Sequence, residues 1–351
     1  MLLAMLLALP VSAETLETLS AFETVKVADG VHAFIARQTE SPLVSGNSLV
    51  VIGDDGVLVV DTGHFPSGTR KMIAQIRKLT PLPVRFVVNT HWHGDHNAGN
   101  SVYAEAFPRA VFISTKATRE AFETEAPKYE PQTLQQQLPA LREALRTGKT
   151  RKGTALSESQ RTYYTRVLEE TDSALPDMLQ SRHLAPSLTF DKELTIFLGK
   201  REVRILFLGR ANTAGDAVVY LPDVKVLATG DLVVYPVPYA FGSFMGEWAK
   251  TMDALLQLDA AVIVPGHGPL MHDKAYPLLV KRIVESLTVQ AASLKTETLE
   301  AARKKLDVKA LRDELTKGDP QLNKDFDSFV LEPGFARAYR EANEGPLHDE
   351  N

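Results

Sequence analysis

Four potential metal ligands fall within six residues of the sequence, in the string His91-Trp92-His93-Gly94-Asp95-His96. Imidazole nitrogens and carboxylate oxygens hold zinc at about 2.0–2.2 Å, so these residue types at this spacing point to metal chemistry. The apolar run 84–88 precedes them and predicts a buried strand. Because side chains alternate along a strand, its end would hold the first two histidines on one side. A turn at Gly94 would aim the aspartate and the third histidine at a neighbouring point, so the segment can serve two adjacent metals.

This string resembles T-H-x-H-x-D-H, the metal-binding signature of the metallo-β-lactamase superfamily. The resemblance extends over roughly residues 25 to 285 and continues in order through four further segments: 59–63, 208–216, 229–231 and 264–268. It implies an α/β fold, the αββα sandwich, in which two sheets lie face to face between helices. It says less about the substrate, because one scaffold of this kind carries many chemistries.

The resemblance also implies a set of zinc ligands, for one or two ions per chain: His91, His93, Asp95, His96, Asn212, Asp231 and His267. The first two histidines and Asn212 would form one site, and Asp95 with the other two histidines would form the second. Asp231 would bridge the two metals. Asp61, in an Asp-Thr-Gly string, would support a metal-bound imidazole from behind.

Asn212 departs from the family pattern, which has a histidine before Thr213. An amide ligates zinc only through its carbonyl oxygen, which is a weaker donor than imidazole, and its side chain is shorter. Three outcomes are open: two metals with a weakened first site, one metal in the second site, or a preference for a more oxygen-loving metal.

The mechanism that the resemblance implies is metal-assisted hydrolysis, in which a metal lowers the pKa of bound water from about 15.7 toward 7 and so makes hydroxide. Asp95 would orient that hydroxide and carry a proton. The side chains expected to contact the substrate are aromatic: Trp92, Tyr235, Tyr239 and Phe241. They would suit a neutral or partly apolar acyl compound. Val234 stands where a lysine often holds the carboxylate of a β-lactam. This weakens the case for a β-lactam substrate without excluding it.

Three functions compete on these residues. The first is an exported zinc-dependent hydrolase that opens a cyclic amide, a lactone or an ester, with β-lactams and lactones as rival substrates and antibiotic resistance as a possible role. The second is a binding protein that kept the scaffold after its metal site was impaired at Asn212. The third is a nuclease of the same superfamily, which the acidic charge and the apparent export signal disfavour.

The chain has 351 residues, a net charge of −5 and no cysteine. The charge gives no reason to expect nucleic acid or a membrane as a partner, so we expect a small-molecule substrate. Disulfides and thiolate ligands are excluded. Residues 1–13 resemble a secretory signal peptide, because the apolar run is too short for a membrane span and ends in small residues. We therefore expect a periplasmic or secreted protein, and the sequence does not indicate its oligomeric state.

The elements that must position the ligands follow from apolar patterns. The runs 49–52 and 57–60 flank a Gly/Asp turn and predict a hairpin whose second strand delivers Asp61. Ser67 can cap the helix that follows. The second half repeats this style in four predicted elements: hairpins over 194–208 and 217–228, a helix over 245–258 and a strand over 261–264.

Residues from about 115 to 185 have a different composition, with few apolar runs, many glutamines and glutamates, and helical spacing. They predict a helical insertion, which either shapes the pocket as a lid or only packs. The predicted organisation is therefore a signal peptide over 1–13, a metallo-β-lactamase-like domain over 14–285 that contains this insertion, and a helical C-terminal extension over 286–351.

Overall fold

The computed structural model describes residues 15–38, 43–150, 153–345 and 347. The signal peptide predicted over 1–13 lies outside these residues. Within the described part of the chain, no helix is long and apolar enough to cross a membrane.

The first sheet has seven strands in sequence order: β1 Phe22–Ala28, β2 Val31–Ala36, β3 Ser48–Ile52, β4 Val57–Val60, β5 Val84–Val88, β6 Val111–Thr115 and β7 Leu188–Phe190. Strands β1 to β4 pair antiparallel, and β4 to β7 pair parallel. Parallel neighbours end at the same edge of a sheet. The residues that follow β4, β5 and β6 therefore gather at one edge, and these are Asp61, the histidine string and the start of the insertion.

The second sheet has five strands: β8 Glu193–Leu198, β9 Arg201–Phe207, β10 Ala217–Leu221, β11 Val226–Val234 and β12 Val262–His267. Its order is β12-β11-β10-β9-β8, and β11 and β12 are parallel. The backbone N–H of Ala217 donates to the carbonyl of Thr90 at 2.8 Å, which links the two sheets beside the histidine string. The hairpins predicted over 49–60, 194–208 and 217–228 are confirmed.

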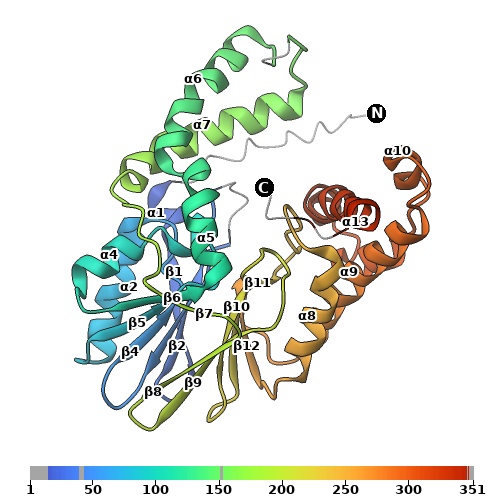
Figure 1. Ribbon diagram of the computed structural model, residues 1–351. Coiled ribbons are helices and arrows are strands. Elements are labelled where there is room, and N and C mark those ends of the chain that lie inside the picture. Colours follow the sequence, from blue (N-terminus) through green and yellow to red (C-terminus); the bar gives the residue numbers. More distant parts are fainter. Residues whose placement is uncertain (1–14, 39–42, 151–152, 346, 348–351) are drawn as a thin grey trace, which may run out of the picture.

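Helices cover the outer faces of the two sheets (Figure 1). Helices α2 Pro66–Leu79 and α4 Asn100–Ala106 pack on the first sheet, and α8 Met245–Gln257 and α9 Ala275–Ser293 pack on the second. Short helices α1 Leu16–Leu19 and α3 Gly94–Asn97 precede β1 and α4. The predicted αββα sandwich is confirmed.

The prediction that Ser67 caps helix α2 is wrong. The N-cap residue is Phe65, and the helix begins at Pro66, whose ring fixes φ near the helical value and whose missing N–H costs nothing in the first turn. Ser67 instead donates its backbone N–H and its hydroxyl to the carboxylate of Asp177. This contact ties α2 to the insertion.

The helical insertion is confirmed over 116–178. It comprises α5 Lys116–Thr124, a 3₁₀ turn Ala126–Tyr129, α6 Pro131–Thr147 and α7 Glu158–Met178. Helices α6 and α7 pack on each other through buried leucines, and Figure 1 shows them beyond the sheet edge at which β6 ends. The insertion therefore leaves the sandwich at the same edge as the metal string.

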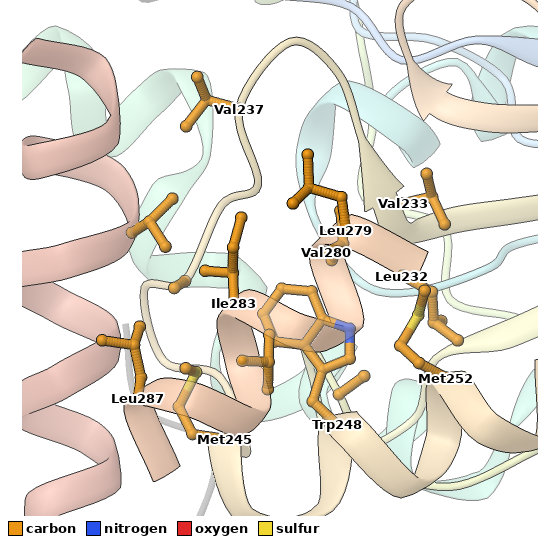
Figure 2. Close-up of a cluster of buried hydrophobic side chains, with 14 of the residues drawn as sticks. Leu232, Val233, Val237, Met245, Trp248, Met252, Leu279, Val280, Ile283 and Leu287 are labelled. Carbon is orange, nitrogen blue, oxygen red and sulfur yellow. The ribbon is translucent and has the colours of Figure 1, made fainter. Parts of the chain in front are cut away.

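The C-terminal extension continues the core of the second half. Its helices are α10 Leu299–Arg303, α11 Lys309–Thr316, α12 Pro320–Phe326, a π-helix Asp327–Leu331 and α13 Glu332–Glu344. Buried Phe326 and Phe335 belong to the same apolar cluster as Trp248 of α8, whose indole lies among Met252, Val280 and Ile283 (Figure 2). The boundary that the sequence analysis draws at residue 285 falls inside α9, which runs unbroken to Ser293.

Candidate metal centre

Two groups of ligand-type side chains meet where the strands of the two sheets end: His91, His93 and Asp231, and Asp95, His96 and His267. Within each group the ligand atoms lie within 4.8 Å of one another. The groups adjoin, because the imidazole rings of His91 and His96 are 4.5 Å apart. The structure thus brings together six of the seven side chains that the sequence analysis assigns to zinc. The second group is the predicted one, and in the first Asp231, predicted as the bridge, joins the two histidines.

Asp231 lies between the two groups. Its Oδ2 is 3.6 Å from His91 Nε2, and its Oδ1 is 3.1 Å from His96 Nε2 and 3.7 Å from His267 Nε2. Each oxygen of the carboxylate therefore faces a different group. The backbone of Gly266 approaches so closely that a Cβ there would lie 2.0 Å from Asp231 Oδ1, so this position requires glycine.

The donor atoms fit a cation. His96 Nε2 and His267 Nε2 are 3.1 Å apart, with Asp95 Oδ2 at 3.6 and 3.0 Å from them, so three donors converge on one point. In the other group, His91 Nε2 is buried and has no hydrogen-bond partner. A buried donor or acceptor without a partner is costly, and a bound metal ion removes that cost.

Asn212, the seventh predicted ligand, is buried, and the direction of its amide is fixed. Its Nδ2 donates to the backbone carbonyl of Tyr239 at 2.6 Å. Only the amide nitrogen can face a carbonyl oxygen, so Oδ1 must point the other way. That Oδ1 is buried without a hydrogen-bond partner, like His91 Nε2. The side chain therefore offers an unused carbonyl oxygen, which is the one atom through which an asparagine can ligate a metal.

Asp61 orients one imidazole in each group. Its Oδ2 accepts from His96 Nδ1 at 2.8 Å and from the Thr90 hydroxyl at 2.7 Å, and Thr90 Oγ1 in turn lies 2.9 Å from His91 Nδ1. These bonds leave the Nε2 atoms of both histidines facing Asp231. Asp61 adopts a left-handed backbone conformation, with φ of 57°, that an aspartate tolerates better than most residues. The sequence analysis places Asp61 behind the metal site, and Thr90 is a positioning residue that it missed.

The charges of the site favour a cation. Burial lowers the pKa of His91 and of His93, which keeps both imidazoles neutral, as metal ligands must be. Burial alone would lower the pKa of His96, but the carboxylates of Asp231, Asp95 and Asp61 outweigh it and raise that pKa well above its usual value. Burial likewise opposes ionisation of Asp95, but the neighbouring histidines hold its pKa well below the usual range. A metal ion bound here would replace the proton on His96, because the same carboxylates stabilise both positive charges.

Two residues that the sequence analysis did not single out hold the ligand loops. Asn47 donates its amide to the carbonyls of Pro265 and Gly268, and so clamps the loop that carries His267. Gly46 donates its N–H to the carbonyl of Asp95 at 2.9 Å. These partners are far apart in the sequence, and the only local signal is a Gly-Asn pair before a strand.

Gly46→Ala should weaken metal binding at the second group. A Cβ at Gly46 would lie 2.3–2.6 Å from three atoms of the His96 ring, so the methyl must displace the imidazole from Asp61. Disturbing the partner of a ligating histidine typically costs roughly 10–100-fold in metal affinity. Competition with a chromophoric chelator measures it. Gly94→Ala is the matched control, because a Cβ at Gly94 has no neighbour within 4 Å. Equal zinc affinity in the two variants would contradict the expected crowding.

The aromatic residues predicted to contact substrate occupy different positions. Trp92 is buried, with its ring 4.6 Å from the ring of His93, and it lines an open pocket together with Gly94 and Tyr129. The rings of Tyr239 and Phe241 lie 4.6 Å apart and are tilted against each other, and the backbone carbonyl of Tyr239 contacts Asn212. Tyr235 is partly exposed and packs on Tyr276.

A sequence model of the metallo-beta-lactamase superfamily matches residues 41–267 and so includes every ligand described above. The chain belongs to the metallo-beta-lactamase superfamily. The sequence-based assignment to this superfamily is confirmed, and the predicted class, a metal-dependent hydrolase, agrees with that membership.

The chain is similar to several individual members of this superfamily. The linear primary-alkylsulfatase of Pseudomonas sp. (strain ATCC 19151) is 27% identical over 229 residues, which are 61% of this chain and 40% of that relative. The chain thus matches less than half of the length of that protein. Two solved structures share the fold: DIM-1 metallo-beta-lactamase, with 19% identity and a TM-score of 0.51, and a metallo-beta-lactamase from Pontibacter korlensis, with 20% and 0.52. Each alignment covers 76% of this chain, and 97% and 99% of the respective structures.

Proposed function

We propose that this chain is a zinc-dependent hydrolase that opens a lactone, an ester or a cyclic amide. The placement of Asp231 carries the proposal, because its two oxygens face the two ligand groups, as a carboxylate shared by two metals requires. The buried acceptors that have no hydrogen-bond partner support it. One ion would be held by His91, His93 and Asn212, and the other by Asp95, His96 and His267.

When bound, zinc supplies Lewis acidity, which lowers the pKa of water and polarises a carbonyl group. The chain supplies the proton transfer. The side chain of Asp95 is 18% exposed and that of Asp231 only 6%, so Asp95 is the more accessible carboxylate. As a carboxylate it can accept a proton from the attacking water and pass it to the leaving group. His267 Nε2 lies 3.0 Å from Asp95 Oδ2, so the two side chains would share one ion.

The substrate is the finer part of the proposal. Val234 ends strand β11 and offers no positive charge to hold the carboxylate of a β-lactam, which favours lactones and esters. The alkylsulfatase relative adds a sulfate ester of a linear primary alcohol as a second candidate. We also propose export to the periplasm or the medium, on the strength of the apolar run that ends in Ala13.

A substrate panel tests the proposal directly. The zinc-loaded protein should turn over an acyl lactone or a p-nitrophenyl ester faster than a chromogenic cephalosporin, with dodecyl sulfate as the fourth compound. Chelation should abolish that turnover by at least about 100-fold, and added zinc should restore it. Because zinc content is measured in the same samples, a fully loaded protein that turns over none of the four compounds would favour the binding-protein alternative.

A further inference from the structure

Five aromatic side chains from three separate segments lie near the ligand groups, and we call them the aromatic rim: Tyr129, Tyr163, Tyr239, Phe241 and Phe329. The exposed fractions of four of them are large for aromatic rings, at 54% for Tyr129, 55% for Tyr163, 39% for Tyr239 and 38% for Phe329. Phe241 is half-buried. Exposed apolar side chains that gather in one place mark a binding surface more often than scattered ones do.

One side of the rim is joined to the first ligand group. The backbone carbonyl of Tyr239 accepts a hydrogen bond from the amide of Asn212, a predicted ligand. Tyr239 is therefore in direct contact with the first ligand group. That ring lies 4.6 Å from the ring of Phe241 and 5.8 Å from that of Phe329. Phe241 and Phe329 are themselves 6.1 Å apart. Three rings therefore form one continuous apolar surface that begins at the metal centre.

The other side of the rim comes from the insertion. The ring of Tyr129 lies 5.9 Å from Trp92, which contacts His93. Tyr163 lies on α7. The Tyr239 hydroxyl is within electrostatic range of Asp95, Asp231, Tyr129 and Tyr163, so the two sides of the rim lie near each other.

The third segment is the C-terminal extension. Phe329 lies in the π-helix Asp327–Leu331, and its backbone carbonyl accepts from the N–H of Ala240 at 2.8 Å. The next residue, Val330, is buried in the core, whereas the Phe329 side chain is exposed. Short π-helical turns frequently occur at functional sites, where they redirect a side chain. The extension, which the superfamily match does not include, thus supplies a ring to the mouth of the site.

We propose that the aromatic rim binds a medium or long acyl or alkyl chain of the substrate and that Phe329 is one of its specificity-determining residues. The reacting bond would then lie at the ligand groups while the chain lies against the rings. Aromatic rings offer large apolar surfaces that lose little conformational freedom on binding, which suits recognition of a flexible chain. The substrate class deepens the hydrolase proposal and rests on it for catalysis, but binding of the chain does not require turnover.

Binding of two carboxylate probes tests the rim without turnover. Decanoate and butanoate share a head group and differ in chain length, and calorimetry on the zinc-loaded protein measures their affinities. We expect decanoate to bind at least about tenfold more tightly, because each buried methylene strengthens binding. Phe329→Ala and Tyr163→Ala should each reduce decanoate affinity about three- to tenfold and leave butanoate unchanged. Phe329→Leu should recover most of the loss.

Phe197→Ala is the matched control. Phe197 is also exposed, at 62%, but it lies on β8 beside Leu198, whose carbonyl bonds Asp54 at the sheet edge opposite the ligands. Phe329→Ala keeps the backbone bond to Ala240, and circular dichroism checks its fold. Equal affinities for the two probes, or equal loss in the Phe197 variant, would overturn the rim. If the rim variants change the molecular mass measured by sedimentation but not the affinity for decanoate, the rings form a subunit interface and the proposal is wrong.

The two proposals fail in distinguishable ways. Metal-dependent turnover without any dependence on chain length would leave the hydrolase and remove the rim. Chain-length-dependent binding without turnover of any compound would leave the rim and remove the hydrolase. If turnover is found, Phe329→Ala should raise KM for a decanoyl ester with little change in kcat, because the rim contacts the chain and not the reacting bond.

Discussion

Asp95→Asn should reduce turnover by roughly 10²–10⁴-fold, the usual contribution of a positioned acid or base, at zinc concentrations that keep the ligand groups filled. The amide keeps an oxygen where the carboxylate oxygen faces His267, but it cannot take up a proton near pH 7. Elemental analysis and initial rates at saturating zinc, measured on the same samples, separate loss of metal from loss of proton transfer.

Asp259→Asn is the control for the Asp95 variant, because Asp259 is exposed and pairs with Lys225 away from the ligands. It should leave turnover unchanged. A fully zinc-loaded Asp95→Asn protein that kept more than about a tenth of the parent rate would remove Asp95 from the proton transfer. A variant that lost zinc in proportion to activity would reduce its role to that of a ligand.

Asn212→Leu should weaken the binding of one zinc ion by roughly 10²–10³-fold, about one quarter of the binding free energy of a four-ligand site, and should leave the other ion in place. The leucine removes the carbonyl oxygen that has no other partner. Asn212→His should do the reverse, because one imidazole nitrogen can donate to the carbonyl of Tyr239 while the other faces the metal. Zinc content after dialysis against a weak chelator distinguishes the three proteins.

Asn343→Leu is the matched control for Asn212. Its side chain also donates Nδ2 to the backbone carbonyl of a tyrosine, Tyr339, but it is exposed on α13. It should bind zinc as the parent does. Two zinc ions of unchanged affinity in Asn212→Leu would show that this residue is not a ligand and that only two histidines and the bridging carboxylate hold the first ion.

The ligands could be predicted because most of them stand next to strand ends, and strand ends are visible in the sequence. The histidine string follows β5, Asp231 lies in β11, and His267 ends β12. The order of these strands fixes one edge of the sandwich, so a linear pattern becomes a cluster. Asp61 could be placed behind the imidazoles for the same reason, since it follows β4.

What the sequence could not show depends on contacts between distant segments. Asn47 reaches the loop around Gly268 across 221 residues, and no local pattern announces such a bond. Phe329, in the π-helix of the extension, meets Tyr239 from a distant part of the sequence. The prediction for Ser67 was wrong because Pro66 already begins the helix, which places Ser67 inside its first turn. The predicted boundary at residue 285 does not coincide with a helix end, because α9 continues from the predicted domain into the predicted extension.

The C-terminal extension combines two duties within a few residues. Val330 and Phe335 are buried in the core of the second half, and Phe329 stands at the mouth of the site. A substitution that changes the ring at the site therefore also affects packing of the adjacent core residues, and the two roles cannot change independently. In the insertion, by contrast, Tyr163 lies on α7, which packs mainly on α6, and Tyr129 ends the 3₁₀ turn before α6. We expect natural variation in substrate preference to accumulate first in the insertion, where it costs the fold least.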